Sequence, residues 1–262
     1  MKIDRIITSI NDNPDYVSFA QFTCWAWHKL GYKVTLNIVG NHTVDVGETA
    51  DIVNWPNLPN VESKKQSQFI RMYNASTYGD EVCMIADIDM VPLSDAPLTA
   101  YGRVPEDHIA QFGYEHPAFQ KNPDVGKWPM HGTAGKGNTL NEIINPNDKS
   151  LQACVLDWSV SMSDYRARPM MKGYFCDESL IKCLLDQWHG KDSRVSKIRR
   201  EESGDFKQHA DGGYTVYGRI DREKWKTLEG ENLQDYFEIH GPRPFTEKWY
   251  SPVAKHLQEV VK

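Results

Sequence analysis

Apolar runs and amphipathic stretches alternate regularly in the first third of the chain. Short runs of consecutive apolar residues predict strands, and longer segments with apolar residues at helical spacing predict helices. Glycines follow the first helix and the second strand, at Gly31 and Gly40. Strands that alternate with helices form a parallel, helix-covered sheet. The predicted strands are Arg5–Ile10, Lys33–Val39, Asp51–Asn54 and the run from Cys83 into Asp87, and the predicted helices are Asp15–Leu30 and Val61–Tyr78.

The alternation is weaker beyond Ser94. A long irregular loop inside a compact domain usually carries function or is disordered. The long glycine-rich loop Glu115–Thr139 is therefore predicted to be a substrate lid or the wall of an acceptor site. Its end, His131–Thr139, lacks the glycine and lysine spacing of a P-loop, which argues against an NTPase of that class. The other predictions are a strand over His108–Tyr114, helices over Lys149–Ser163, Glu178–His189 and Thr246–Val261, and a charged loop over Arg199–Gly213.

Composition and charge narrow the class of protein. The 262 residues are 40% hydrophobic and 25% charged, which is typical of a soluble globule large enough for a substantial core. A net charge of −6 argues against nucleic acid or an anionic membrane as the main partner. Five scattered cysteines predict a reducing compartment. Without a signal-like N-terminus or an apolar run of membrane-spanning length, the protein is expected to be cytoplasmic, with no integral membrane segment.

Two aspartates follow a strongly apolar run. Cys83–Ala86 has the character of a strand buried on both faces, and Pro92 is expected to end that strand. Residues i and i+2 of an extended chain point to one side, so Asp87 and Asp89 should present their carboxylates together while Ile88 faces the core. Such a pair suits Mg²⁺ or Mn²⁺, beyond the carboxyl end of a strand where open α/β sheets bind ligands. A solvated turn or helix cap is the alternative, and the buried strand favours the metal.

Polar residues form a stripe on the helix that precedes these aspartates. Lys64, Gln68 and Arg71 lie at positions i, i+4 and i+7, which places them on one helical face. This face is expected to border the same cleft, where Arg71 could pair with a phosphate or with one of the aspartates. A solvated helix face is the alternative, more so for Lys64 than for Arg71.

Three segments together resemble the nucleotide-sugar half of GT-A fold glycosyltransferases. They are Thr8–Asp12 at the end of the first strand, Ser67–Tyr73 within the helix, and Ile85–Leu93 with its Asp-x-Asp motif. The resemblance implies an α/β fold, Rossmann-like, with a mostly parallel central sheet flanked by helices and an irregular C-terminal acceptor half. It implies a single domain over residues 1–262, in which residues 1–93 bind the nucleotide sugar and residues 94–262 bind the acceptor.

The resemblance also implies roles for particular residues. Asp87 would meet the donor ribose, Asp87 and Asp89 would hold Mn²⁺ or Mg²⁺, and a C-terminal histidine, His240, would supply a third ligand. Arg243 nearby could meet a phosphate. The residues expected to border the donor pocket are Ser9, Asn11, Gln68 and Arg71.

Two acids open a predicted amphipathic helix, at Asp177 and Glu178. Many inverting members of the group keep an Asp or Glu there as the base that deprotonates the acceptor hydroxyl. Acids at a helix N-terminus also cap the helix and favour its dipole. The sequence leaves both readings open, with Asp177 the better cap and Glu178 the freer side chain.

The predicted activity is therefore metal-dependent transfer of a sugar from a UDP- or GDP-sugar to a hydroxyl of a glycan. A divalent ion would neutralise the leaving diphosphate as the glycosidic bond breaks. A sugar-1-phosphate nucleotidyltransferase is a first alternative, but Ser9–Pro14 lacks the glycine-rich loop expected after its first strand. A non-catalytic protein that binds nucleotide sugars or glycans is the second, and the intact Asp87, Asp89 and His240 weigh against it.

Overall fold

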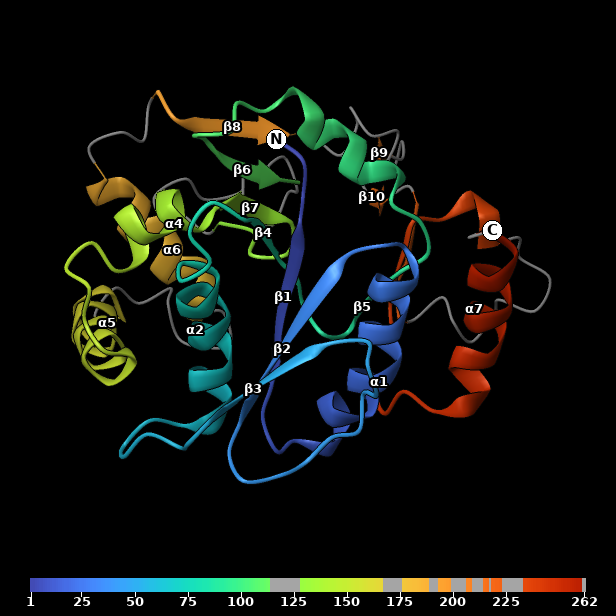
Figure 1. Ribbon diagram of the computed structural model, residues 1–262, viewed down its shortest axis with the longest axis horizontal. Coiled ribbons are helices and arrows are strands. Elements are labelled where there is room, and N and C mark those ends of the chain that lie inside the picture. The colour runs from blue at the N-terminus through green and yellow to red at the C-terminus, as the bar shows by residue number, and fades with distance from the viewer. Residues whose placement is uncertain are drawn as a thin grey trace.

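The computed structural model of the chain describes residues 1–113, 128–166, 176–188, 193–198, 206–208, 214–216, 218–222 and 233–260. Its centre is a seven-stranded sheet in the order β3-β2-β1-β4-β7-β6-β8 (Figure 1). Within this sheet β7 runs antiparallel to its neighbours β4 and β6, and the other pairings are parallel. The strands are β1 Arg5–Ile10, β2 Lys33–Val39, β3 Asp51–Trp55, β4 Val82–Ile85, β6 Ile109–Phe112, β7 Thr133–Lys136 and β8 Val195–Ile198.

Helices cover both faces of the central sheet. Helices α2, α4, α5 and α6 lie on one face, and α1 and α7 lie on the other (Figure 1). The Asn13 side chain accepts a hydrogen bond from the Asp15 backbone N–H at 3.0 Å and so caps α1. The bounds are α1 Pro14–Lys29, α2 Ser63–Ala75, α4 Gly137–Ile144, α5 Leu151–Arg166, α6 Cys176–Gln187 and α7 Glu247–Val260, with 3-10 turns η1 Ala96–Arg103 and η5 Leu233–Asp235.

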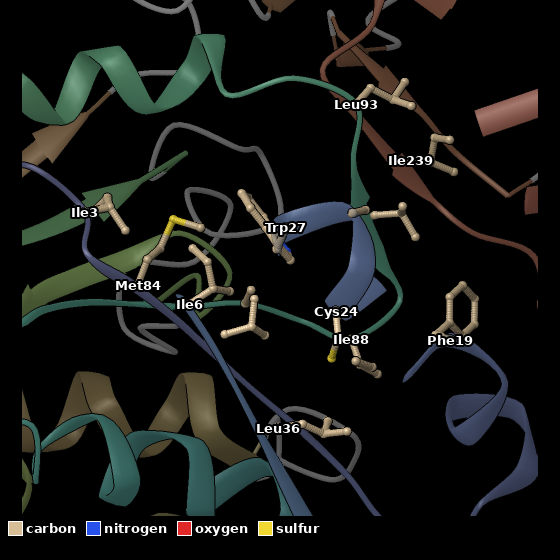
Figure 2. Packing of buried hydrophobic residues seen from close by; sticks show 14 of the residues in the cluster. Ile3, Ile6, Phe19, Cys24, Trp27, Leu36, Met84, Ile88, Leu93 and Ile239 are labelled. Carbon is tan, nitrogen blue, oxygen red and sulfur yellow. The ribbon is translucent and has the colours of Figure 1, made fainter. Parts of the chain in front are cut away.

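Alternation along β1 separates two hydrophobic clusters. Ile6 and Ile10 face α1, whereas Ile7 faces the cluster under α2. Figure 2 shows the first cluster, in which Ile6 and Met84 of the sheet pack together with side chains of α1 such as Trp27. This central strand is therefore buried on both faces, although Thr8 and Ser9 interrupt its apolar residues.

A second, three-stranded sheet begins with β5, directly after β4 of the central sheet. Its strands are β5 Met90–Pro92, β11 Arg219–Ile220 and β12 Glu238–His240, in the order β11-β12-β5. Because β12 runs antiparallel to β5, His240 lies opposite Met90, next to the paired aspartates. Pro92 was expected to end the strand that begins near Cys83. That strand instead ends at Ile85, and Pro92 closes β5.

The glycine-rich segment differs from its predicted loop. Residues 133–136 form β7 and Gly137 begins α4, so the prediction of a loop over Glu115–Thr139 is wrong there, while residues 114–127 lie outside the described residues. Part of the predicted loop Arg199–Gly213 is also a strand, β9 Phe206–Gln208, paired with β10 Tyr214–Val216; its other residues are not described. Among the helices that the structure describes, none combines the length and apolarity needed to cross a membrane.

Candidate active site

A cavity of about 630 Å³ opens at the carboxyl ends of β1 and β4, where the two sheets meet. Open α/β sheets bind ligands at this edge. The cavity gathers every residue predicted from the sequence to take part in binding or catalysis. These residues are Ser9, Asn11, Lys64, Gln68, Arg71, Asp87, Asp89, Asp177, Glu178, His240 and Arg243.

The paired aspartates lie in a turn between the sheets and not in an extended strand. β4 ends at Ile85, and the Met90 N–H donates to the Asp87 carbonyl at 3.1 Å, which closes the turn. The prediction that both carboxylates leave one side of an extended chain is therefore wrong. The Asp87 side chain is 39% exposed and the Asp89 side chain 7%, and the two bind different arginines.

The backbone of this turn is held from several elements. The Ala86 N–H donates to the Ile7 carbonyl at 2.9 Å, and the Thr23 hydroxyl of α1 donates to the Ile88 carbonyl at 2.9 Å. The Gly241 N–H donates to the Asp89 carbonyl at 2.9 Å. These contacts fix both aspartates relative to α1 and to β12, because neither end of the turn can move alone.

Arg71 connects α2, the turn and α6. One terminal nitrogen donates to an Asp87 oxygen and to the Ala86 carbonyl, and the other donates to an Asp177 oxygen. Burial lowers the pKa of the Arg71 guanidinium. The charges and hydrogen bonds of Asp87 and Asp177 raise it by more, so the net pKa lies above its ordinary value. Arg71 thus remains charged, and its predicted pairing with one of the aspartates is present.

The two acids at the start of α6 have different surroundings. The Asp177 side chain is almost fully buried, binds Arg71 through one oxygen and accepts the Glu178 N–H through the other at 3.0 Å. Glu178 also lines the cavity, and its backbone carbonyl accepts the Trp128 N–H at 3.1 Å. Asp177 therefore serves as a buried partner of Arg71, and Glu178 lines the cavity beside it.

His240, the last residue of β12, stands between two carboxylates. Its Nε2 is 3.6 Å from an Asp89 oxygen and its Nδ1 is 3.4 Å from an Asp221 oxygen. Burial lowers the pKa of His240, but hydrogen bonds to Asp221 and Asp89 raise it by more, so the net pKa lies above the ordinary value. No motif in the sequence indicates a role for Asp221, which follows the short strand β11.

Two arginines bind the Asp89 carboxylate. Arg222 donates to it through Nη2, which also lies against Nε2 of His240, and Arg243 reaches the same oxygen at 2.5 Å. Burial raises the pKa of Asp89, but His240, Arg243 and Arg222 together hold it well below its usual range. Arg243 was anticipated from the sequence as a phosphate contact. Arg222 was missed, because only its pairing across the fold reveals it.

His131 is a further residue that sequence reasoning did not identify as part of the site. The backbone N–H of Asp87 donates to its Nδ1 at 3.2 Å, so the ring proton resides on Nε2, which is 3.0 Å from a Glu238 oxygen. The imidazole therefore links the aspartate turn to β12. Its sequence neighbourhood is glycine-rich and carries no spacing that indicates this role.

The donor types in the cavity suit a hard divalent cation. Asp87, Asp89 and His240 offer two carboxylates and an imidazole, and Asp221 orients the imidazole from its far side as carboxylates do for metal-ligating histidines. Among the residues described, however, no three His, Cys, Asp or Glu side chains are already gathered closely enough to hold a metal ion. The residues fit such a cation chemically, provided that Asp89 exchanges its arginine partners.

Comparisons with known proteins identify the architecture. No protein-family model and no curated protein matches the chain. The solved galactosyltransferase LgtC, in complex with donor and acceptor sugar analogs, aligns with 98% of this chain and 95% of its own, with a TM-score of 0.52 and 9% identity. The chain has the GT-A fold.

Two further structures agree with this assignment. An active-site mutant of LgtC aligns over 98% of this chain and 94% of its own, with a TM-score of 0.52 and 10% identity. The glycosyltransferase GlyE from Streptococcus pneumoniae TIGR4 matches all of this chain and 65% of its own, with a TM-score of 0.50 and 10% identity. These structures confirm the predicted GT-A fold class. Because the sequence identities are so low, the likeness supports the fold alone. Within the GT-A fold, the cavity occupies the rim where the two sheets join.

Proposed function

We propose that this protein is a metal-dependent glycosyltransferase that moves a sugar from a UDP- or GDP-sugar to a hydroxyl group of a glycan acceptor. One observation carries the proposal. Asp87, Asp89 and His240, which are distant in sequence, line one cavity at the carboxyl edge of a GT-A sheet. Oxygen and imidazole donors at that edge are suited to a cation that holds a diphosphate.

The site residues predicted from the sequence then have separate chemical tasks. Asp87, the more exposed aspartate, is available to the donor ribose, while Arg71 keeps its carboxylate in place. Asp89 and His240 would hold Mn²⁺ or Mg²⁺, which supplies positive charge against the diphosphate as the sugar leaves. Ser9, Asn11 and Gln68 would border the nucleoside.

Glu178 is our choice for the base that takes the proton of the acceptor hydroxyl if the reaction inverts the anomeric centre. It shares the cavity with the aspartates, whereas Asp177 is held by Arg71 inside the protein. In a retaining reaction the same carboxylate would orient the acceptor or the donor sugar. The division of the domain into a donor half over residues 1–93 and an acceptor half over residues 94–262 belongs to the same proposal.

A screen of sugar nucleotides tests the function. UDP- and GDP-sugars are incubated with the protein and Mn²⁺, with and without glycan acceptors, and release of UDP or GDP is measured. Asp89→Ala should lower the rate by roughly 100-fold, because charge stabilisation of the leaving group is lost. Asp186→Ala, which changes an exposed aspartate on α6, is the matched control and should keep the rate.

Three outcomes would contradict the proposal. Equal activity of the wild type and Asp89→Ala would remove the metal role of Asp89. Tight, metal-dependent binding of UDP or GDP without turnover of any sugar nucleotide would indicate a binding protein. Formation of a sugar nucleotide from a sugar 1-phosphate and a nucleoside triphosphate would indicate a nucleotidyltransferase.

A further inference from the structure

The positive charges around Asp89 raise a question that the proposed function alone does not answer. Two guanidinium groups, from Arg222 and Arg243, bind one buried carboxylate that is also expected to ligate a divalent cation. A cation and an arginine cannot occupy the same side of one oxygen. Both guanidinium groups contact Oδ2, the Asp89 oxygen that faces His240, so a cation held by Oδ2 and His240 together must open at least one of these ion pairs.

The geometry distinguishes the two arginines. Nη2 of Arg222 contacts both the Asp89 carboxylate and Nε2 of His240, so it lies between the two expected metal ligands. Arg243 approaches the same Asp89 oxygen, and its guanidinium stacks on the Tyr16 ring at 4.2 Å. Its position is fixed by an aromatic face as well as by Asp89.

Resting on the proposed function, we propose that Arg222 is an exchangeable counter-ion of Asp89 that gives way to the divalent cation and then binds the donor diphosphate. The guanidinium occupies the place of the cation in the metal-free protein and neutralises the buried carboxylate there. When the cation takes Asp89 and His240, Arg222 is released within the same cavity. Guanidinium groups bind phosphate oxygens through paired donors, which makes the diphosphate its next partner.

The charge balance of the cavity supports this exchange. Arg219, Arg222 and Arg243 face the carboxylates of Asp89, Asp221 and Glu238, so the fixed charges around His240 cancel. A divalent cation and a diphosphate diester also cancel each other. Both states of the cavity are therefore near neutrality, and neither leaves a buried charge without a partner.

Within the part of the chain that the structure describes, Arg222 has one hydrogen bond to the backbone besides its contacts with Asp89 and His240. Its Nε donates to the Gly241 carbonyl at 2.8 Å, at the point where β12 has ended. The side chain is 28% exposed, in contrast to 7% for Asp89, and it lines the open cavity. The guanidinium can consequently turn about its long stem without unpacking the core.

Manganese binding to the metal-free protein tests the first half of the exchange. Manganese chloride is titrated into the wild type, Arg222→Ala, Lys64→Ala and Asp89→Ala, and the free ion is measured by electron paramagnetic resonance. Arg222→Ala should bind Mn²⁺ roughly tenfold more tightly than the wild type, because the competing charge-assisted bond is gone. Lys64→Ala removes a positive charge from the same cavity without freeing Asp89, and should change the affinity by less than about twofold.

The outcomes separate this proposal from the proposed function. Manganese binding that requires Asp89 but is equal in the wild type and Arg222→Ala overturns the exchange and leaves the metal site. An equal gain in Lys64→Ala and Arg222→Ala also overturns it, because the effect is then general electrostatics. The absence of manganese binding in all four proteins overturns both proposals.

Nucleotide binding tests the second half. At saturating Mn²⁺, calorimetry with UDP and with GDP should show affinity for at least one of them in the wild type. Arg222→Ala should weaken that affinity roughly tenfold, and Arg222→Lys should restore part of it, since lysine keeps the charge without the paired donors. Unchanged affinity in Arg222→Ala overturns the transfer to the diphosphate, and no binding of UDP or GDP by the wild type contradicts the proposed function instead.

Discussion

Arg71 is a buried cation whose charge is balanced by carboxylates from two other segments of the chain. It is buried and is bound by two carboxylates, one of which is as buried as the guanidinium itself. The desolvation of Arg71 and Asp177 is offset only while both are present. Because the two residues come from α2 and α6, their pairing also holds these helices at a fixed separation on one face of the sheet.

We expect Arg71→Ala to lower the free energy of unfolding by about 3 kcal/mol, because it leaves the Asp177 carboxylate buried without its counter-ion. Urea unfolding measures this change. Gln68→Ala, one turn earlier on the same helix, should cost less than about 1 kcal/mol. If the charge is the cause, adding Asp177→Asn to Arg71→Ala should recover part of the loss. A double variant no more stable than Arg71→Ala would contradict the electrostatic explanation.

Sequence reasoning found most of the candidate site because its chemistry is local. Asp87 and Asp89 follow an apolar run, and Arg71 and Gln68 follow helical spacing. Arg222 and His131 could not be found in this way. Arg222 is defined by a partner far away in the sequence, and His131 by a hydrogen bond to a backbone N–H. Such pairings appear only when the segment after β11 and the segment before β7 are brought to the aspartate turn.

At the scale of elements, the glycines around β7 explain why a loop was predicted where the structure has a strand and a helix. A Cβ at Gly135 would meet the Ile109 side chain at 2.7 Å, and a Cβ at Gly137 would meet the Gly79 backbone nitrogen at 2.6 Å. Glycine is required at these two positions because other segments of the same chain approach closely. Glycine enrichment also signals loops, so the sequence alone does not distinguish the two causes.

Gly137→Ala should destabilise the protein by about 2 kcal/mol, because the added methyl group meets backbone atoms of Tyr78 and Gly79 that cannot rotate away. Thermal unfolding followed by circular dichroism measures the loss. Gly102→Ala is the control, since a Cβ there has no neighbour within 4 Å, and its melting temperature should match that of the wild type. Equal stability of Gly137→Ala and Gly102→Ala would refute the close approach.

The strands that the sequence predicted and those it missed differ in the range of their contacts. β1 and β2 were predicted with their observed bounds, because each is a short segment rich in β-branched and apolar residues and a helix intervenes between them. β5 and β12 are short, and each is stabilised by a partner distant in the chain. Short strands of this kind lack a periodicity long enough to identify them.

At the scale of the whole molecule, the C-terminal segment joins the first helix to the site. Phe245 is buried and stacks on Phe19 of α1, with ring centroids 4.7 Å apart, and its N–H donates to the Ser18 hydroxyl at 2.8 Å. α7 follows directly and packs against α1 (Figure 1). This packing fixes the loop that carries Arg243, two residues before Phe245.

Phe245→Ala should reduce the free energy of unfolding by about 3 to 5 kcal/mol, since it removes a buried ring from the contact between α1 and the C-terminal segment. Guanidinium unfolding gives the value. Lys255→Ala changes an exposed residue of α7 and should stay within about 0.5 kcal/mol of the wild type. A Phe245→Ala protein as stable as Lys255→Ala would show that the segment is dispensable for the fold.

The aspartate turn connects β4 of the large sheet to β5 of the small one. Its carboxylates contact arginines from the elements around it. A ligand bound to that turn is therefore expected to stabilise the seven-stranded and the three-stranded sheet at the same time. Amide protons of β4 and of the strand pair β5–β12 would then exchange with solvent more slowly together once the cavity is filled, although no backbone ladder joins the two sheets among the residues that the structure describes.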